Sequence, residues 1–141
     1  MKITPLVSKT EITVRFCEVD PMHIVWHGNY IKYFEDGRED FGEKYGLSYS
    51  TIFNNQLLTP IVKMQCEYRC SLTFGEKAIV ETQYVNTEAA KIIFKYKIFR
   101  KSNSELVATG ESVQVFLNIQ KELQLTHPQF FLDWKKRWGI H

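Results

Sequence analysis

The sequence has little cysteine and no long apolar run. Its three cysteines, Cys17, Cys66 and Cys70, form no C-x-x-C pair. Cys66 and Cys70 are four residues apart in a strand-like segment, too far apart for a disulfide, so we expect three reduced thiols, as is usual in the cytoplasm. No stretch of about 18 apolar residues exists to span a bilayer, and "MKITPLVSKTEI" lacks the apolar segment of a signal peptide. The sequence therefore predicts a cytoplasmic protein without a membrane span.

A large charge excess is also missing. The net charge of +2 gives no overall basic field for nucleic acid, and the seven glycines form neither a G-x-G-x-x-G motif nor a P-loop. Basic residues do gather at two places, in the segment 91–101 and in "KKR" at 135–137. Each cluster can be explained in two ways: as the solvated face of a strand or helix, or as a surface that contacts the phosphates of an anionic carrier.

Hydrophobic residues make up 44% of the chain and aromatic residues 14%, which indicates one globular domain over residues 1–141. A period-2 pattern predicts a strand over 12–17. From Asn29 the period changes to that of an amphipathic helix, with Asn29 as N-cap and Gly46 as C-terminal stop. Gly37 lies on the apolar stripe of this helix and costs about 1 kcal/mol relative to alanine. We expect it to allow close packing against another backbone.

Four further strands are predicted at 62–69, 77–85, 91–99 and 106–117, joined by short connections that favour antiparallel neighbours. A terminal helix is predicted from Pro128, with Phe131, Trp134 and Trp138 on one stripe and a solvated basic flank. One long helix cannot cover both faces of such a sheet. The pattern predicts an α+β roll whose other face is covered by a second copy of the subunit.

Three polar residues stand between the first strand and the long helix: Asp20, His23 and His27. A helix N-terminus presents unpaired N–H groups and a partial positive charge, which suits a developing oxyanion. A carboxylate folded back beside these amides is a minimal hydrolytic site, in which one group attacks or activates water and the other polarises a carbonyl.

The same residue types also occur in metal sites and in thiol-dependent hydrolases. "HIVWH" has the spacing of a zinc pair but lacks the glutamate of H-E-x-x-H and looks extended, so the sequence predicts no metal site. Cys17 could be a nucleophilic thiol with His23 or His27 as its base, but the sequence offers no third group to orient the histidine. His27, beside a helix N-terminus, is expected to be mainly neutral and either orients a carboxylate, a water or a leaving group, or only packs.

The segment "VRFCEVDPMHIVWHGNYIKYFEDGRED" resembles the signature of the 4-hydroxybenzoyl-CoA thioesterase family of hot-dog-fold proteins, which includes short-chain acyl-CoA thioesterases associated with the Tol-Pal system. The matching features are the "DP" step, the apolar "IVWH" and the "NY" that opens a helix carrying "FEDGRE". Downstream, "CEYRCSLTFGEKAIVE" is similar to the next strand, turn and strand of the family. The resemblance covers about residues 11–117 and leaves the C-terminal extension, about 127–139, outside it.

The resemblance implies a five-stranded antiparallel sheet wrapped around a long central helix, with an extra C-terminal helix, in a homodimer or homotetramer whose active sites lie between subunits. It implies that Asp20 is the nucleophile or general base, that the backbone of His27 or Gly28 polarises the thioester carbonyl, and that the His27 side chain assists.

No cofactor is implied, and the substrate would be an acyl-CoA or an acyl carrier protein thioester. The residues expected to contact it are Val25, Trp26, Asn29 and Tyr30. His23 stands where many relatives have glycine, and its side chain either narrows the acyl pocket or points away. A hot-dog hydratase or dehydratase, and a non-catalytic module that binds acyl thioesters, are the alternative functions.

Overall fold

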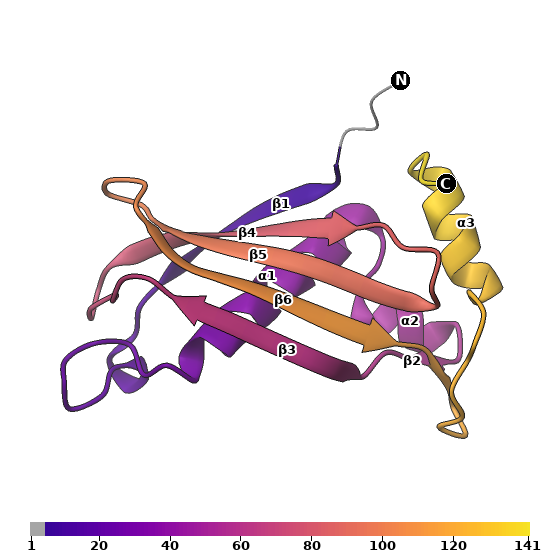
Figure 1. Cartoon of the computed structure of the whole chain (residues 1–141), viewed down its shortest axis with the longest axis horizontal. Coiled ribbons are helices and arrows are strands. Elements are labelled where there is room, and N and C mark those ends of the chain that lie inside the picture. Colours follow the sequence, from indigo (N-terminus) through magenta and orange to yellow (C-terminus); the bar gives the residue numbers. More distant parts are fainter. Residues whose placement is uncertain (1–4) are drawn as a thin grey trace.

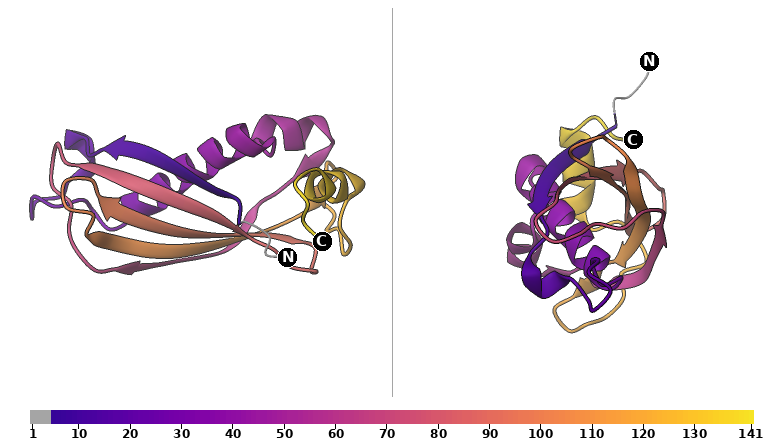
Figure 2. Two further views of the ribbon diagram at one scale, coloured as in Figure 1. Left: turned by 90° about the horizontal axis from the view of Figure 1, so that it is seen from above. Right: turned by 90° about the vertical axis from the view of Figure 1, so that its left-hand side faces the viewer.

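The computed structural model describes residues 5–141, so residues 1–4 of the predicted domain lie outside the described part. Five antiparallel strands form one sheet in the order β1-β4-β5-β6-β3. The strands are β1 (Val7–Thr13), β3 (Ile61–Tyr68), β4 (Lys77–Val85), β5 (Lys91–Arg100) and β6 (Leu106–Val115). The long helix α1 (Asn29–Tyr45) lies against one face of the sheet (Figure 1). The right-hand view of Figure 2 shows that the sheet curls around this helix. The predicted hot-dog fold is confirmed.

Smaller elements complete the chain. A 3-10 turn, η1 (Phe16–Glu18), precedes α1, and a short helix, α2 (Tyr49–Asn54), follows it. Two short strands, β2 (Leu57–Leu58) and β7 (Leu117–Asn118), pair with each other, so the predicted strand 106–117 is divided after Val115. The C-terminal helix is α3 (Gln129–Arg137). No helix of residues 5–141 is long and apolar enough to cross a membrane.

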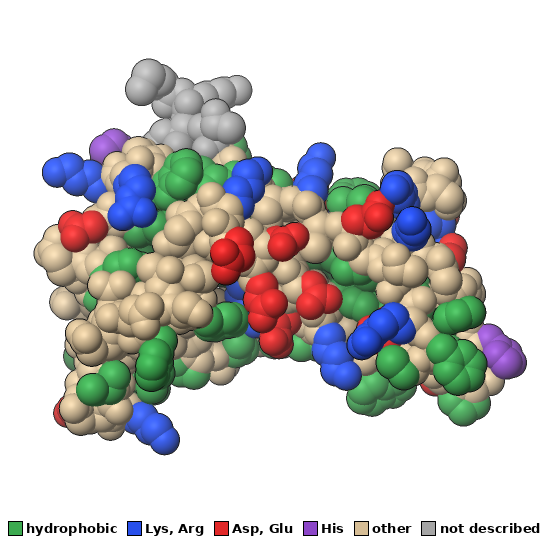
Figure 3. Space-filling view, turned by 180° about the vertical axis from the view of Figure 1, so that it is seen from behind, with side chains coloured by type: hydrophobic (Ala, Val, Ile, Leu, Met, Phe, Trp, Pro, Cys, Tyr) green, Lys and Arg blue, Asp and Glu red, His purple; other side chains and the backbone are tan. Residues whose placement is uncertain are grey.

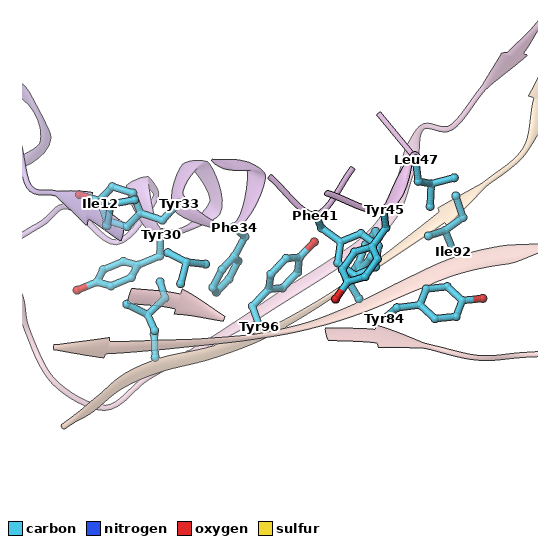
Figure 4. Packing of buried hydrophobic residues seen from close by; sticks show 14 of the residues in the cluster. Ile12, Tyr30, Tyr33, Phe34, Phe41, Tyr45, Leu47, Tyr84, Ile92 and Tyr96 are labelled. Carbon is cyan, nitrogen blue, oxygen red and sulfur yellow. The ribbon is translucent and has the colours of Figure 1, made fainter. Parts of the chain in front are cut away.

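The apolar stripe of α1 packs against the concave face of the sheet (Figure 4). Phe34 is fully buried and stacks on Tyr96 of β5, with ring centroids 4.5 Å apart. Phe41 meets Phe94 of the same strand edge to face at 4.9 Å. Strand β5 alternates as predicted, with Ile92, Phe94, Tyr96 and Ile98 buried and three lysines exposed. Burial of these large side chains is the main stabilising contribution that holds α1 in place.

Two glycines shape α1. Gly46 ends the helix in the left-handed region at φ 75°, as predicted. A Cβ at Gly37 would lie 2.4 Å from Thr82 Oγ1 and 2.9 Å from Val80 Cγ1, both on β4. The prediction of close packing at Gly37 is confirmed, but the neighbours are side chains and not another backbone.

Helix α3 packs against the C-terminal end of α1. The indole N–H groups of Trp134 and Trp138 both donate to the carbonyl oxygen of Tyr45, at 2.7 and 2.9 Å. This carbonyl is one of those that a helix end leaves without an intrahelical partner. The predicted basic flank is only partly solvated, because Lys135 is buried and its Nζ donates to Thr87 O at 3.4 Å.

The first predicted strand was placed too late in the chain. Strand β1 ends at Thr13, where its pairing with β4 ends at Lys77, and the chain then turns into η1. Val14 remains buried, but Phe16 is 77% exposed. The alternating pattern continued past the end of the pairing partner, so the tertiary pairing and not the pattern set the strand boundary.

Strand β3 also differs from its prediction. The face predicted to be covered is open at both ends, with Val62 57% and Tyr68 49% exposed. β3 lies at the edge of the sheet, and its register with β6 shifts between Ile61 and Lys63. An edge strand lacks a neighbour on one side, so its apolar side chains are only half covered within this chain.

We predict that Gly37→Ala lowers the unfolding free energy by about 1–3 kcal/mol, because the overlap with Thr82 and Val80 outweighs a gain in helix propensity of about 1 kcal/mol. Urea unfolding measures this, with Glu39→Ala on the exposed face of α1 as the control. Equal or higher stability of Gly37→Ala would contradict the packing described.

Candidate active site

The segment before α1 folds back on itself as a small hairpin. Val19 and Val25 form an antiparallel bridge, the Trp26 N–H donates to Glu18 O at 2.9 Å, and the Asp20 N–H donates to Ile24 O at 2.9 Å. The hairpin is held to the segment after β3 by the Val25 N–H, which donates to Leu72 O at 2.9 Å. This pairing brings the backbone of residues 18–20 alongside residues 24–26, just before the helix begins.

Asp20 is partly buried at the start of the hairpin turn. Its Oδ1 accepts the Met22 N–H at 2.8 Å, an Asx-type contact that holds the carboxylate. Its other carboxylate oxygen receives no hydrogen bond from the described residues, and Asp20 makes no ion pair with them. The carboxylate therefore keeps one oxygen available for a substrate or a water.

His23 occupies the turn with a positive φ of 66°, in the left-handed region that favours glycine. Its N–H donates to Asp20 O at 2.8 Å, and its side chain is exposed. A glycine at this position would adopt the same backbone conformation without steric strain. Within residues 5–141, no group of three or more His, Cys, Asp or Glu side chains is arranged to hold a metal ion.

The start of α1 differs from its prediction. Asn29 is the first helical residue and not the N-cap; Gly28 stands at the N-cap position and offers no side chain. Asn29 instead donates from Nδ2 to Glu18 O at 2.8 Å. The N–H groups of His27 and Gly28 donate to no acceptor in the described chain, so two backbone donors are open at the positive end of the helix.

Trp26 covers Gly28. A Cβ added at Gly28 would lie 2.2 Å from the nearest carbon of the Trp26 indole, so any larger residue displaces that ring. The indole is 49% exposed, and its centroid lies 4.9 Å from that of the exposed His27 ring. Among the residues expected to contact substrate, Trp26 is at the surface, whereas Val25, Asn29 and Tyr30 are buried.

Tyr68 joins the edge strand β3 to the helix start. Its hydroxyl donates to His27 O at 2.9 Å, and its ring meets that of Tyr30 edge to face at 5.2 Å. Partial burial raises the pKa of Tyr68 to about 12, with a smaller contribution from the Cys66 thiol. The phenol is therefore protonated at neutral pH and remains a donor. Sequence reasoning gave Tyr68 no role at this site, because the contact joins residues 41 positions apart.

Glu18 is a second residue that sequence reasoning missed. It is 7% exposed, and its Oε1 accepts the Arg15 N–H at 2.7 Å and the Tyr33 hydroxyl at 3.1 Å. The Arg15 Nε lies 3.6 Å from its other oxygen. The main-chain oxygen of the same residue accepts from both Trp26 and Asn29. The only sequence signal was an acid two residues before Asp20.

Cys17, the alternative nucleophile, is an exposed free thiol in η1. No histidine forms a hydrogen bond with it in the described part of the chain. The arrangement around Asp20 thus supplies a carboxylate and open amides, whereas that around Cys17 supplies no base.

A family model described as the thioesterase-like superfamily matches residues 14–135. A putative acyl-CoA thioesterase of Bacillus subtilis, YneP, is 31% identical over 91% of this chain and 92% of its own length. The crystal structure of a DHNA-CoA thioesterase from Staphylococcus aureus superposes with a TM-score of 0.85 at 28% identity, covering 94% of this chain and 89% of that one. A 4-hydroxybenzoyl-CoA thioesterase mutant complexed with 4-hydroxybenzoyl-CoA shares the fold, with a TM-score of 0.79 at 18% identity over 92% of this chain and 98% of that one.

We predict that Glu18→Ala lowers the unfolding free energy by about 1–3 kcal/mol, because it leaves the Tyr33 hydroxyl and the Arg15 N–H without their acceptor. Urea unfolding tests this, with Glu35→Ala on the exposed face of α1 as the matched control. Stability of Glu18→Ala within the error of wild type would show that the carboxylate does not hold the loop.

The raised pKa of Tyr68 predicts a late ionisation step. The difference in phenolate absorbance between wild type and Tyr68→Phe should stay flat through about pH 10, where ordinary tyrosines titrate, and rise near pH 12. The stabilising effect of the raised pKa is complete below about pH 10 and is lost as the pH rises through the folded value. A difference step at pH 10 would contradict the assigned environment.

Proposed function

The chain belongs to the thioesterase-like superfamily, and on that premise we propose that it hydrolyses an acyl-CoA to a free carboxylic acid and CoA. The arrangement of Asp20 and the start of α1 supports this proposal most directly. A carboxylate with one unengaged oxygen, Asp20, lies in a hairpin that is hydrogen-bonded to the start of α1. The amides of His27 and Gly28, just before the first helical residue, are open. The named thioesterases among its relatives and structural neighbours support the same chemistry.

In the proposed reaction the thioester carbonyl oxygen accepts a hydrogen bond from the N–H of His27 or Gly28. The helix start stabilises the negative charge that develops on this oxygen when the carbonyl carbon becomes tetrahedral. Asp20 either attacks that carbon, giving an anhydride that water then hydrolyses, or removes a proton from the attacking water. Collapse of the intermediate breaks the carbon–sulfur bond and releases the CoA thiolate, which takes up a proton.

His27 and Trp26 frame the entrance in this proposal. Both side chains are exposed and adjacent, so they can contact the acyl-thioester group or orient the water and the leaving sulfur. Val25, Asn29 and Tyr30 are buried within the chain, and we assign them to the wall behind the site. Tyr68 holds the His27 carbonyl, which keeps the neighbouring amides directed outward.

We further propose that two copies associate along β3. This strand has one free edge, and Val62 and Tyr68 on it are exposed, although Ala108, the partner of Tyr68 on β6, is fully buried. Exposed Phe16 and Phe74, in edge-to-face contact at 5.9 Å, extend the apolar surface at the end of the molecule where Asp20 lies. Pairing of free edges is a common route to a homodimer, and dimers can pair further into tetramers.

The proposed mechanism requires no cofactor. We propose that the protein acts in the cytoplasm. The three cysteines are free thiols in the structure, which is compatible with that reducing compartment.

We predict that Asp20→Asn lowers kcat/KM for acyl-CoA hydrolysis by about 10²–10⁴, because the amide can neither attack nor accept a proton from water. The assay is free-thiol release over a panel of short, long and aromatic acyl-CoAs, with the same acyl groups on acyl carrier protein. Asp133→Asn is the matched control, since Asp133 is an exposed residue of α3. Near-normal turnover by a folded Asp20→Asn would sink the assignment.

The same panel separates the alternatives. Saturable binding of acyl-CoAs without thiol release from any of them identifies a non-catalytic module. When an enoyl-CoA is included in the panel, loss of its enoyl absorbance without thiol release identifies a hydratase.

A further inference from the structure

A hollow lies between α1, α2 and the adjoining ends of β5 and β6. Its volume is about 330 Å³, within the range of small-molecule sites. Its wall combines apolar side chains, Leu47, Ile52, Ile92 and Phe94, with the polar groups of Arg38, Ser48, Tyr49 and Gln114. Arg38 is ten residues along α1 from Gly28, a rise of about 15 Å.

This hollow is separate from the Asp20 site. Phe34, which is fully buried on α1, stacks on Tyr96 of β5 between the two regions, and Tyr96 in turn contacts Arg38. No open path runs through such a packed pair of rings. The hollow is therefore not the inner end of the proposed thioester site within this chain.

Arg38 is the unusual feature of the wall. It is only 8% exposed, and a guanidinium remains charged even when buried. Its Nε donates to Tyr49 Oη at 2.9 Å and its Nη1 to Tyr96 Oη at 3.0 Å, both neutral acceptors. No carboxylate of residues 5–141 lies within ion-pair distance of it, although buried charges are ordinarily paired.

Donors remain available in the hollow. A guanidinium has five N–H bonds, and the contacts of Arg38 use two of them. The Tyr49 hydroxyl accepts from Arg38, and its own proton has no acceptor in the described chain. A planar carboxylate matches this set, because it accepts from the guanidinium in parallel and from the phenol beside it.

We propose that this hollow binds a small organic acid with one carboxylate, its charged end on Arg38 and its organic body against Ile52, Ile92 and Phe94. The acidic residues at the rim, Glu39, Asp40 and Glu43, argue for a single negative charge. They belong to the acidic face of α1, whose side chains gather over the middle of the view in Figure 3. A doubly charged phosphate meets more repulsion there and leaves the apolar wall uncovered.

The test is calorimetric titration of the full chain with benzoate at neutral pH. It needs no thioester, so its outcome is independent of the proposed hydrolysis. We expect saturable binding that is retained in Asp20→Asn, weakened at least tenfold in Arg38→Met, and unchanged in Arg137→Met, an exposed arginine that matches the loss of charge. Benzamide, which has the same shape without the charge, and inorganic phosphate should bind at least tenfold more weakly than benzoate.

Two further variants keep the proposal testable if Arg38→Met fails to fold. Tyr49→Phe removes the free phenolic proton and also the acceptor of the Arg38 Nε, so it should weaken benzoate binding severalfold and lower the unfolding temperature slightly. Ser50→Trp fills the entrance of the hollow from an exposed position and should weaken benzoate binding severalfold with unchanged thermal unfolding. The proposal is overturned if benzoate gives no saturable binding, if benzamide or phosphate binds as well, or if binding persists in the folded variants. Loss of binding in Asp20→Asn alone would also overturn it, by placing the acid at the other site.

Discussion

The main-chain carbonyl of Glu18 is the point on which the site depends. Two donors from the other side of the hairpin, the Trp26 N–H and the Asn29 amide, converge on it. The first fixes the hairpin that carries Asp20, and the second fixes the first residue of α1. Because one oxygen holds both, the carboxylate and the helix start have a set spacing before any substrate arrives. The buried side chain of Glu18, held by Tyr33, prevents this short segment from turning over.

The start of α1 is held in a fixed position because the apolar face of the helix is buried in the core. Phe34, Phe41 and Tyr45 pack against β5 and α3, and Gly37 lets the axis come close to β4. Each fully buried aromatic side chain contributes on the order of 2–3 kcal/mol. Moving the helix start relative to the sheet would disturb several such contacts together, so the position of the open amides is set by packing along the whole of α1.

Periodicity predicted the fold well where burial follows the local pattern. The long helix, its stop at Gly46, the strand 77–85 and the alternation of β5 are all as expected. The periodic pattern predicted wrongly where pairing with another strand sets the boundary or the burial. Phe16 lies outside β1 because the pairing of β1 with β4 ends at Lys77. Val62 is exposed because β3 has only one neighbouring strand. The residue type of Asn29 favours an N-cap, but its side-chain amide donates to Glu18 O instead, and Gly28 stands at the cap position. Tyr68 was missed because its contact with His27 joins residues 41 positions apart. Glu18 was missed because its contacts with Trp26, Asn29 and Tyr33 form only when the segment before α1 folds back on itself.

The two indoles on the Tyr45 carbonyl bear on the order in which the protein is completed during synthesis. Strand β5 pairs with its two neighbours in the chain, β4 and β6, and the outer strands β1 and β3 precede them in the sequence. The sheet can therefore form as soon as β6 has left the ribosome. The end of α1 must wait for Trp134 and Trp138, which are 89 and 93 residues further on. A nascent chain that has reached only β6 therefore carries a central helix with one end unfinished. Helix α3 and the residue after it, which are translated last, supply the two indole donors that complete this end of α1.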